Sequence, residues 1–207
     1  MLVKVCGITR RQDASLLSAV GVDMCGFIFH EGSPRYLSPE AAAGLHTGDM
    51  RRVGVFVGQD AAETRRIMET ARLHFAQLHG NQSPQCGRRI GPERIIRVIW
   101  PARHASAEAL QRALDVWADS CAYYLVDAGL GGGGSGQRCD TALLARVRFP
   151  HPWLLAGGVD VADAAQLAQC FSPSGLDFNS SLEDGAGVKN HDKLRALGAL
   201  LPTLRRI

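Results

Sequence analysis

The sequence predicts an α/β fold, a closed (β/α)8 barrel of eight parallel strands that spans residues 1–207 as a single domain. Short apolar runs alternate with longer amphipathic stretches along the whole chain, a pattern typical of parallel strands joined by right-handed helical crossovers. Eight such pairs fit into the chain at about 26 residues each, close to the minimum for a strand, a helix and two short loops. A doubly wound open sheet is the alternative, because periodicity alone does not show whether the sheet closes.

The expected strands are mostly continuous apolar runs, as in the segment VGVFV at 53–57. Strands covered on both faces have this composition, whereas half-exposed strands alternate between apolar and polar residues. The expected strands cover residues 2–6, 24–29, 52–57, 75–78, 94–99, 122–126, 153–155 and 175–178.

Helix start signals support several of the stretches between the strands. Ser38 is followed by Pro39 and Glu40, which gives an N-cap, a proline at the first helical position and an acid in the first turn. Asp60 and Ser106 are further candidate N-caps. The expected helices cover residues 10–20, 38–47, 60–72, 83–90, 106–119, 140–147, 161–169 and 190–206.

Composition excludes several classes of function. The chain has 23 Lys and Arg against 20 Asp and Glu, and a net charge of +3 is too weak to favour a nucleic-acid partner. Its apolar runs are far shorter than the roughly 20 residues that cross a bilayer, so we expect no membrane association. The N-terminus shows no secretory signal, and the six cysteines form no C-x-x-C pair. We therefore expect free thiols, a cytoplasmic location and no metal site.

An acid and a base are expected at the mouth of the barrel, because catalytic residues of this fold follow its strands. Cys6 ends the first expected strand and Asp127 follows the sixth. A thiolate can remove a proton and a carboxylic acid can donate one, which is the pair that proton-transfer catalysis needs. The alternatives are that Cys6 is a small buried hydrophobe and that Asp127 is a cap or an ion-pair partner.

A phosphate site is predicted after the last two strands, where this fold often binds phosphate. Gly157 and Gly158 follow the seventh strand, and Asn179, Ser180 and Ser181 follow the eighth. Glycine lets the backbone approach an anion, while hydroxyls and helix N-termini supply donors. The alternative is that the glycines only turn the chain and Ser180 caps a helix.

The glycine-rich run at 129–136 also follows a strand, and its first six residues match G-x-G-x-x-G. A dinucleotide site would need an acid at the end of the next strand, and none is there. A Walker A loop is excluded because Gln137 stands where lysine would follow Gly136. The run is better interpreted as a loop that covers a ligand and adds backbone donors to its phosphate, with a disordered connection as the alternative.

Arg35 and His79 complete the set of polar residues at strand ends. The planar fork of arginine suits a carboxylate, although Arg35 could instead be a solvated loop cation. His79 is a candidate substrate contact, and the alternative is that it only shapes the turn after the fourth strand.

Several motifs, in order from the first strand to the last helix, resemble the phosphoribosylanthranilate isomerase family of tryptophan biosynthesis. The combination of the first two is highly specific. The motifs are KVCGIT (4–9), GFIFHEGSPRYLSPEAA (26–42), VGVFV (53–57), QLHG (77–80), LLAGGV (154–159) and DFNSSLEDGAGVKNHDKL (177–194).

The resemblance implies a cofactor-free barrel enzyme that performs the Amadori rearrangement of its small-molecule substrate, N-(5-phosphoribosyl)anthranilate. It makes Cys6 the general base and Asp127 the general acid, and it places the anthranilate carboxylate on Arg35. The enzyme is expected to be a monomer or a homodimer. The phosphate is expected at small residues of three loops, namely Gly134, Ser135, Gly136, Gly157, Gly158, Asn179, Ser180 and Ser181.

The chain departs from the family pattern after the eighth strand. The family usually has Asp-Val-Ser-Ser-Gly-Val-Glu, and aligning on Asp177 and Glu183 puts Asn179 at a serine and Ser181 at the glycine. Ser181 is the larger change, since glycine there could serve a backbone conformation that other residues disfavour. In the glycine-rich loop, Ser135 replaces a threonine and keeps the hydroxyl.

Two other functions are open at this point. One is a different phosphosugar isomerase on the same barrel, of the aminoimidazole ribonucleotide pathway. Such enzymes typically use two aspartates, whereas the first strand here ends in Cys6. The other is a degenerate barrel kept as a binding partner of a pathway enzyme, which only the changes at Asn179 and Ser181 favour.

Overall fold

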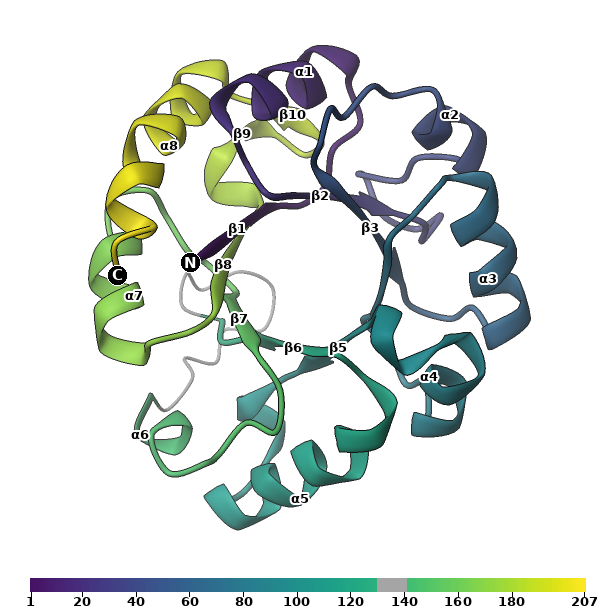
Figure 1. Ribbon diagram of the computed structural model, residues 1–207, viewed down its shortest axis with the longest axis vertical. Coiled ribbons are helices and arrows are strands. Elements are labelled where there is room, and N and C mark those ends of the chain that lie inside the picture. Colours follow the sequence, from purple (N-terminus) through teal and green to yellow (C-terminus); the bar gives the residue numbers. More distant parts are fainter. Residues whose placement is uncertain (130–140) are drawn as a thin grey trace.

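A closed barrel of eight parallel strands forms the centre of the computed structural model, which describes residues 1–129 and 141–207 (Figure 1). Neighbouring strands pair in chain order, and β1 closes the ring by pairing with β8. The predicted (β/α)8 fold is therefore confirmed, and the open-sheet alternative is wrong. The strands are β1 (Leu2–Val5), β2 (Met24–Ile28), β3 (Arg51–Phe56), β4 (Phe75–Leu78), β5 (Ile95–Ile99), β6 (Tyr123–Asp127), β7 (Trp153–Ala156) and β8 (Gly175–Phe178).

Helices surround the barrel and connect its strands (Figure 1). The three predicted caps are confirmed, because Ser38, Asp60 and Ser106 each accept a hydrogen bond from the backbone N–H three residues later, at 2.8–3.2 Å. None of the described helices has the length and apolar character to cross a bilayer. The helices are α1 (Arg11–Val20), α2 (Pro39–Ala43), α3 (Ala61–Thr70), α4 (Pro84–Ile90), α5 (Ala107–Trp117), α6 (Thr141–Leu144), α7 (Ala164–Phe171) and α8 (His191–Leu204).

Three helices differ most from the ranges that the sequence predicts. The helix expected at 38–47 ends at Ala43, because Gly44 caps it. The helix expected at 140–147 is the single turn of α6. α7 begins three residues later than expected. Asp163 Oδ1 accepts a hydrogen bond from the backbone N–H of Asp160, and Asp160 Oδ1 accepts one from the backbone N–H of Ala162, and this local bonding competes with helix formation.

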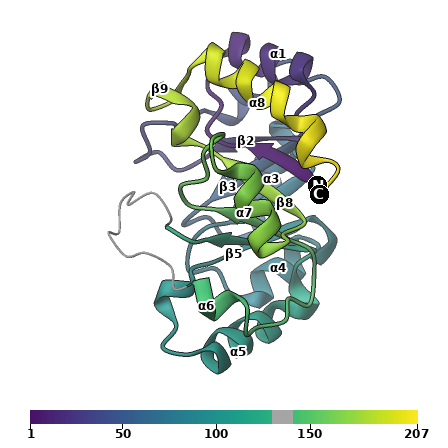
Figure 2. The same ribbon diagram turned by 90° about the vertical axis from the view of Figure 1, so that its left-hand side faces the viewer.

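A short antiparallel hairpin between β8 and α8 is absent from the sequence prediction. A single 3₁₀ turn, η4 (Ser180–Leu182), leads from β8 into β9 (Glu183–Gly185), which pairs with β10 (Val188–Lys189). Both views place this hairpin beside α1 and α8 (Figures 1 and 2). It is too short and too polar to give a strand signal.

The side chains of the barrel alternate between two apolar regions. Val3 and Val5 of β1 belong to the large core between strands and helices. The inside of the barrel holds a separate cluster, and it also takes up buried polar side chains such as Lys4, Gln77 and Asp177. The apolar cluster inside the barrel comprises Met24, Val53, Phe75, Ile96, Val98, Leu125, Leu154 and Ala156.

Candidate active site

A cavity of about 630 Å³ opens at the carboxyl ends of the barrel strands. Every described residue that the sequence predicts for the site lines it, whereas Gly134, Ser135 and Gly136 lie outside the described residues. The predicted residues in its wall are Cys6, Arg35, His79, Asp127, Gly157, Gly158, Asn179, Ser180 and Ser181.

Cys6 follows β1 and is only 5% exposed. Its thiol packs against Gly26 of β2, where an added Cβ would come within 2.7 Å of the sulfur. Glycine at this position therefore makes room for the thiol. Burial raises the pKa of Cys6, and the nearby ammonium of Lys4 opposes that effect.

Lys4 and Asp177 form an ion pair beneath Cys6. The register of β1 and β8 sets them side by side, and Lys4 Nζ lies 2.7 Å from Asp177 Oδ2. Burial would lower the pKa of Lys4, but the negative charges of Asp177 and Cys6 raise it overall. Sequence reasoning missed both residues, although each is a charged residue inside an otherwise apolar strand.

Two buried oxygens of the barrel accept no hydrogen bond within the described residues. They are Asp177 Oδ1 and Gln77 Oε1, and both residues line the cavity. Buried acceptors are normally paired, so these atoms suit the hydroxyl groups of a bound ligand.

Asp127 ends β6 and is half-buried. A Cβ at Gly157 would collide with Asp127 Oδ1 and with the backbone nitrogen of Gly129, and Gly157 has a φ of +87°. Both the space and the backbone conformation therefore require glycine beside this carboxyl group. β6 and β1 are three strands apart around the ring, so Asp127 and Cys6 reach the cavity from different sides.

His79 is a neutral imidazole in this site. Burial lowers its pKa to about 4, although the Asp127 carboxylate acts in the opposite direction. The Gln77 amide donates a hydrogen bond to His79 Nδ1 at 3.2 Å, which leaves the ring proton on Nε2. The ring edge also meets Trp100, with centroids 5.3 Å apart. His79 can thus donate one hydrogen bond but is a poor acid at neutral pH.

The loops after β7 and β8 are tied together by Ser181. Its hydroxyl donates to the carbonyl of Val159 at 2.6 Å, so this oxygen is committed to the loop framework. Ser181 does not adopt a left-handed backbone conformation, which removes the expected conflict with the glycine of the family pattern. The groups of these two loops that remain available to hold an anion include backbone N–H groups and the hydroxyl of Ser180.

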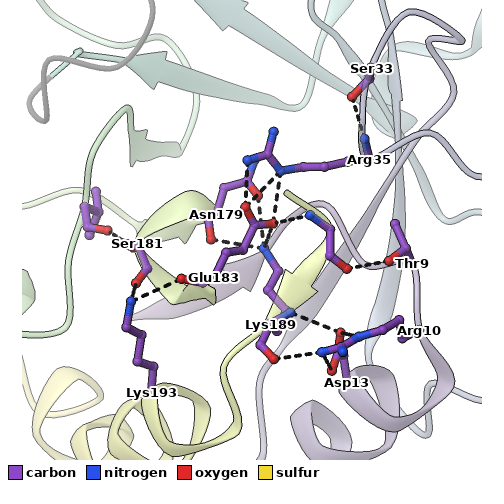
Figure 3. Close-up of polar contacts among 12 residues, drawn as sticks. Thr9, Arg10, Asp13, Ser33, Arg35, Asn179, Ser181, Glu183, Lys189 and Lys193 are labelled. Atoms are coloured by element: carbon purple, nitrogen blue, oxygen red, sulfur yellow. Dashed lines mark hydrogen bonds and ion pairs between the residues drawn. The ribbon is translucent and has the colours of Figure 1, made fainter. Parts of the chain in front are cut away.

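Arg35 lines the same cavity as Cys6, and its guanidinium is bound by Glu183 of the hairpin (Figure 3). Its side chain packs over Gly7, where an added Cβ would lie 2.8 Å from Arg35 Cδ. The guanidinium donates from Nη2 to Glu183 Oε2 at 2.6 Å and from Nε to Glu183 Oε1 at 3.0 Å. Lys189 Nζ donates to the same carboxylate at 2.9 Å. Sequence reasoning missed Glu183 and Lys189 as parts of the site, because nothing in the sequence shows that the hairpin folds back onto Arg35.

The arrangement is chemically suited to proton transfer to and from an anionic, hydroxyl-bearing ligand. It combines a buried thiol, a carboxyl group on another side and loops with anion donors. Among residues 1–129 and 141–207, no three His, Cys, Asp or Glu side chains are grouped closely enough to ligate a metal ion.

Comparison with known proteins identifies the same family along nearly the whole chain. The family model described as N-(5'phosphoribosyl)anthranilate (PRA) isomerase matches residues 3–198. The N-(5'-phosphoribosyl)anthranilate isomerase of Desulfovibrio desulfuricans is 54% identical over 196 residues, which cover 95% of this chain and 93% of that protein.

Two solved structures show the same architecture. The phosphoribosyl anthranilate isomerase of Thermus thermophilus superimposes with a TM-score of 0.82 at 36% identity, covering 99% of this chain and 100% of the other. Another, solved with reduced 1-(o-carboxyphenylamino)-1-deoxyribulose 5-phosphate, has a TM-score of 0.76 at 26% identity and covers 96% of this chain and 97% of its own.

Proposed function

The chain belongs to the N-(5'-phosphoribosyl)anthranilate isomerase family, and from this premise we propose that Cys6 is the general base and Asp127 the general acid of its reaction. The enzyme converts N-(5-phosphoribosyl)anthranilate into 1-(2-carboxyphenylamino)-1-deoxyribulose 5-phosphate, a step of tryptophan biosynthesis. The observation that carries the proposal is that these two side chains enter one cavity from strands three places apart.

The first step is ring opening. Asp127 donates a proton to the furanose oxygen as the bond from that oxygen to C1 breaks, and the anthranilate nitrogen supplies the electron pair that forms the Schiff base. The positive charge on the nitrogen makes the hydrogen on C2 acidic. The second step is its removal by Cys6, which gives an enolamine that tautomerises to the ketone. Atoms and charge balance over the whole reaction: Asp127 releases one proton and Cys6 gains one, and in the tautomerisation the C2 hydroxyl loses a proton while C1 gains one. Proton exchange with solvent then returns both groups to their starting states.

Cys6 must become a thiolate to act as a base. Burial alone favours the neutral thiol, whereas the Lys4 ammonium favours the thiolate. The buried ion pair with Asp177 keeps Lys4 charged beneath the thiol. A base whose conjugate acid has a raised pKa is also a stronger proton acceptor once it is ionised.

Substrate binding is proposed from the groups around the acid and the base. Arg35 binds the anthranilate carboxylate, His79 contacts the substrate through its Nε2 proton, and the two unpaired acceptors Asp177 Oδ1 and Gln77 Oε1 receive sugar hydroxyls. The phosphate is bound by small residues that follow β6, β7 and β8. These are Gly134, Ser135, Gly136, Gly157, Gly158, Asn179, Ser180 and Ser181.

The test is a fluorescence assay that follows consumption of phosphoribosylanthranilate by wild type, Cys6→Ser and Asp127→Asn. Turnover by wild type and loss of turnover in both variants support the proposal. Full activity in Cys6→Ser would refute Cys6 as the base, and full activity in Asp127→Asn would refute Asp127 as the acid. The substrate of the aminoimidazole pathway is assayed beside it, and preferential turnover of that compound would reassign the enzyme. We also propose that the enzyme is cytoplasmic and that it is a monomer or a homodimer. Light scattering of the purified protein distinguishes these two oligomeric states.

A further inference from the structure

We propose that Glu183 is a positioning residue that fixes one edge of the Arg35 guanidinium, so that the other edge faces the carboxylate of the substrate. The inference rests on the proposed function, because it presumes that Arg35 binds that carboxylate. It adds a residue of the hairpin to the specificity machinery of the enzyme.

The guanidinium has two edges that can each bind a carboxylate through two parallel hydrogen bonds. One edge consists of Nε and Nη2, and both of these nitrogens donate to Glu183 at 2.6–3.1 Å. The other edge consists of Nη1 and the second N–H of Nη2. Within the described residues Nη1 has no hydrogen-bond partner, and Figure 3 shows the guanidinium turned with its first edge on Glu183.

Glu183 is buried and held by several hydrogen bonds, and the guanidinium that it binds lines the cavity. The Glu183 side chain is 4% exposed. Its carboxylate accepts hydrogen bonds from four groups, namely Arg35 Nε, Arg35 Nη2, Lys189 Nζ and the N–H of Gly187. Arg35 itself keeps 21% of its side chain exposed and lines the cavity next to Cys6. A donor that is already held in place loses little conformational entropy when it binds ligand, and this is the advantage of the hydrogen bonds from Arg35 to Glu183.

The charges of the cluster also favour a second carboxylate. Arg35 and Lys189 carry one positive charge each and Glu183 carries one negative charge, so the three side chains sum to +1. Burial opposes ionisation of Glu183, but the hydrogen bonds from Arg35 and Lys189 outweigh it and lower its pKa. The bond to Glu183 in turn raises the pKa of Arg35. One bound carboxylate would neutralise the cluster.

The experiment compares two substrates that differ only in the carboxylate. One is phosphoribosylanthranilate, and the other is the glycosylamine formed from aniline and ribose 5-phosphate. We expect Glu183→Gln to raise KM for the first about 10-fold with kcat changed less than about 3-fold, since a loosened donor weakens ground-state binding. For the aniline compound, kcat/KM should change less than about 2-fold, because it has no carboxylate to orient.

Asp184→Asn is the matched control, since it makes the same chemical change at the next residue of β9, which is exposed and bonds to Asn190. It should leave both substrates unaffected. Equal losses on both substrates in Glu183→Gln, or no loss on either, would overturn the inference.

The double variant Glu183→Gln/Lys189→Met covers the case in which the single variant fails to fold, because it removes both buried charges together. Lys189 Nζ also donates to the carbonyl and Oδ1 of Asn179 at 3.0 Å, so this variant should weaken both substrates, with the greater loss for the carboxylated one. Titration calorimetry of the reduced product gives a binding measurement. Arg35→Met tests carboxylate binding by Arg35 separately from the positioning of Arg35 by Glu183. If Arg35→Met lowers kcat/KM equally for both substrates, the proposed role of Arg35 is wrong. If its loss is selective for the carboxylated substrate and the loss in the Glu183 variants is not, only the positioning role of Glu183 is wrong.

Discussion

Lys4 Nζ lies 2.7 Å from Asp177 Oδ2 inside the barrel, joining the first strand to the last, two residues before Cys6. Lys4 is fully buried, and removing both charges from water costs several kcal/mol per ion in proteins. Such a pair is weak evidence for stability, because apolar residues of similar volume often stabilise a core at least as well. The position of Lys4 two residues before Cys6, on the strand that leads into Cys6, points instead to an electrostatic effect on the thiol.

Replacing Cys6 with serine tests the base. We expect kcat to fall by about 100-fold or more, because a hydroxyl is a far weaker base near neutral pH and a positioned base typically contributes 10²–10⁴-fold. The melting temperature should stay close to that of wild type, since the two side chains have similar size. Steady-state fluorescence kinetics measure the effect, and a variant that keeps most of the wild-type rate would show that the base is another group.

The pH dependence of kcat/KM tests how burial and the Lys4–Asp177 pair shift the pKa of the Cys6 thiol. Burial raises the pKa of Cys6, so the thiolate fraction, and with it kcat/KM, should rise with pH through a value above that of an ordinary thiol. Lys4 lowers this pKa and does so more strongly than Asp177 raises it. The neutral pair Lys4→Met/Asp177→Asn should therefore move the rise to still higher pH.

The single variant Asp177→Asn should have the opposite effect. It leaves the Lys4 charge uncompensated, so the rise of kcat/KM should move to lower pH. Both profiles are recorded at temperatures where circular dichroism shows a folded protein, since an unpaired buried charge costs about 3–5 kcal/mol of stability. Shifts of the same sign in the two variants would contradict the electrostatic account.

The strands and the polar residues at their ends could be predicted from sequence, because each is a local signal. Continuous apolar runs indicate strands covered on both faces, and Cys6 and Asp127 stand where such runs end. The partner of a buried charge is not local. Lys4 and Asp177 are 173 positions apart, and only closure of the ring brings them together. The Glu183 contact with Arg35 spans 148 positions and depends on a hairpin too short to carry a periodic signal.

Replacing Asp127 with asparagine tests the acid. The amide has no acidic proton for the furanose oxygen, so kcat should fall by about 100-fold or more. The side chain keeps its shape beside Gly157, so the reduced product should still bind, as measured by titration calorimetry. His79 is the other candidate acid, but burial lowers its pKa to about 4. Full activity in Asp127→Asn together with loss in His79→Asn would reverse the two roles.

Replacing Arg35 with methionine tests the carboxylate site. A hydrogen bond to a charged group contributes about 1.5–3 kcal/mol, so kcat/KM should fall roughly 10- to 150-fold, mainly through KM. Methionine keeps the aliphatic packing over Gly7 while it removes the partner of Glu183. A decrease below about threefold would place Arg35 outside the binding of the anthranilate group.

The phosphate site is tested by soaking crystals in sulfate and by varying the loops after β7 and β8. Backbone N–H donors tolerate the loss of one side chain, and the Ser181 hydroxyl is already bound to Val159, so Ser180→Ala and Ser181→Ala should each change KM little. Gly158 has a φ of +104°, so Gly158→Ala introduces the backbone strain without adding a charge. Gly158→Asp adds a like charge at the anion and should raise KM far more than Gly158→Ala.

The sulfate soak shows where the anion binds. Sulfate density at the loops after β7 and β8, together with competition by millimolar phosphate, supports the phosphate site, whereas an anion found only at Arg35 would refute it.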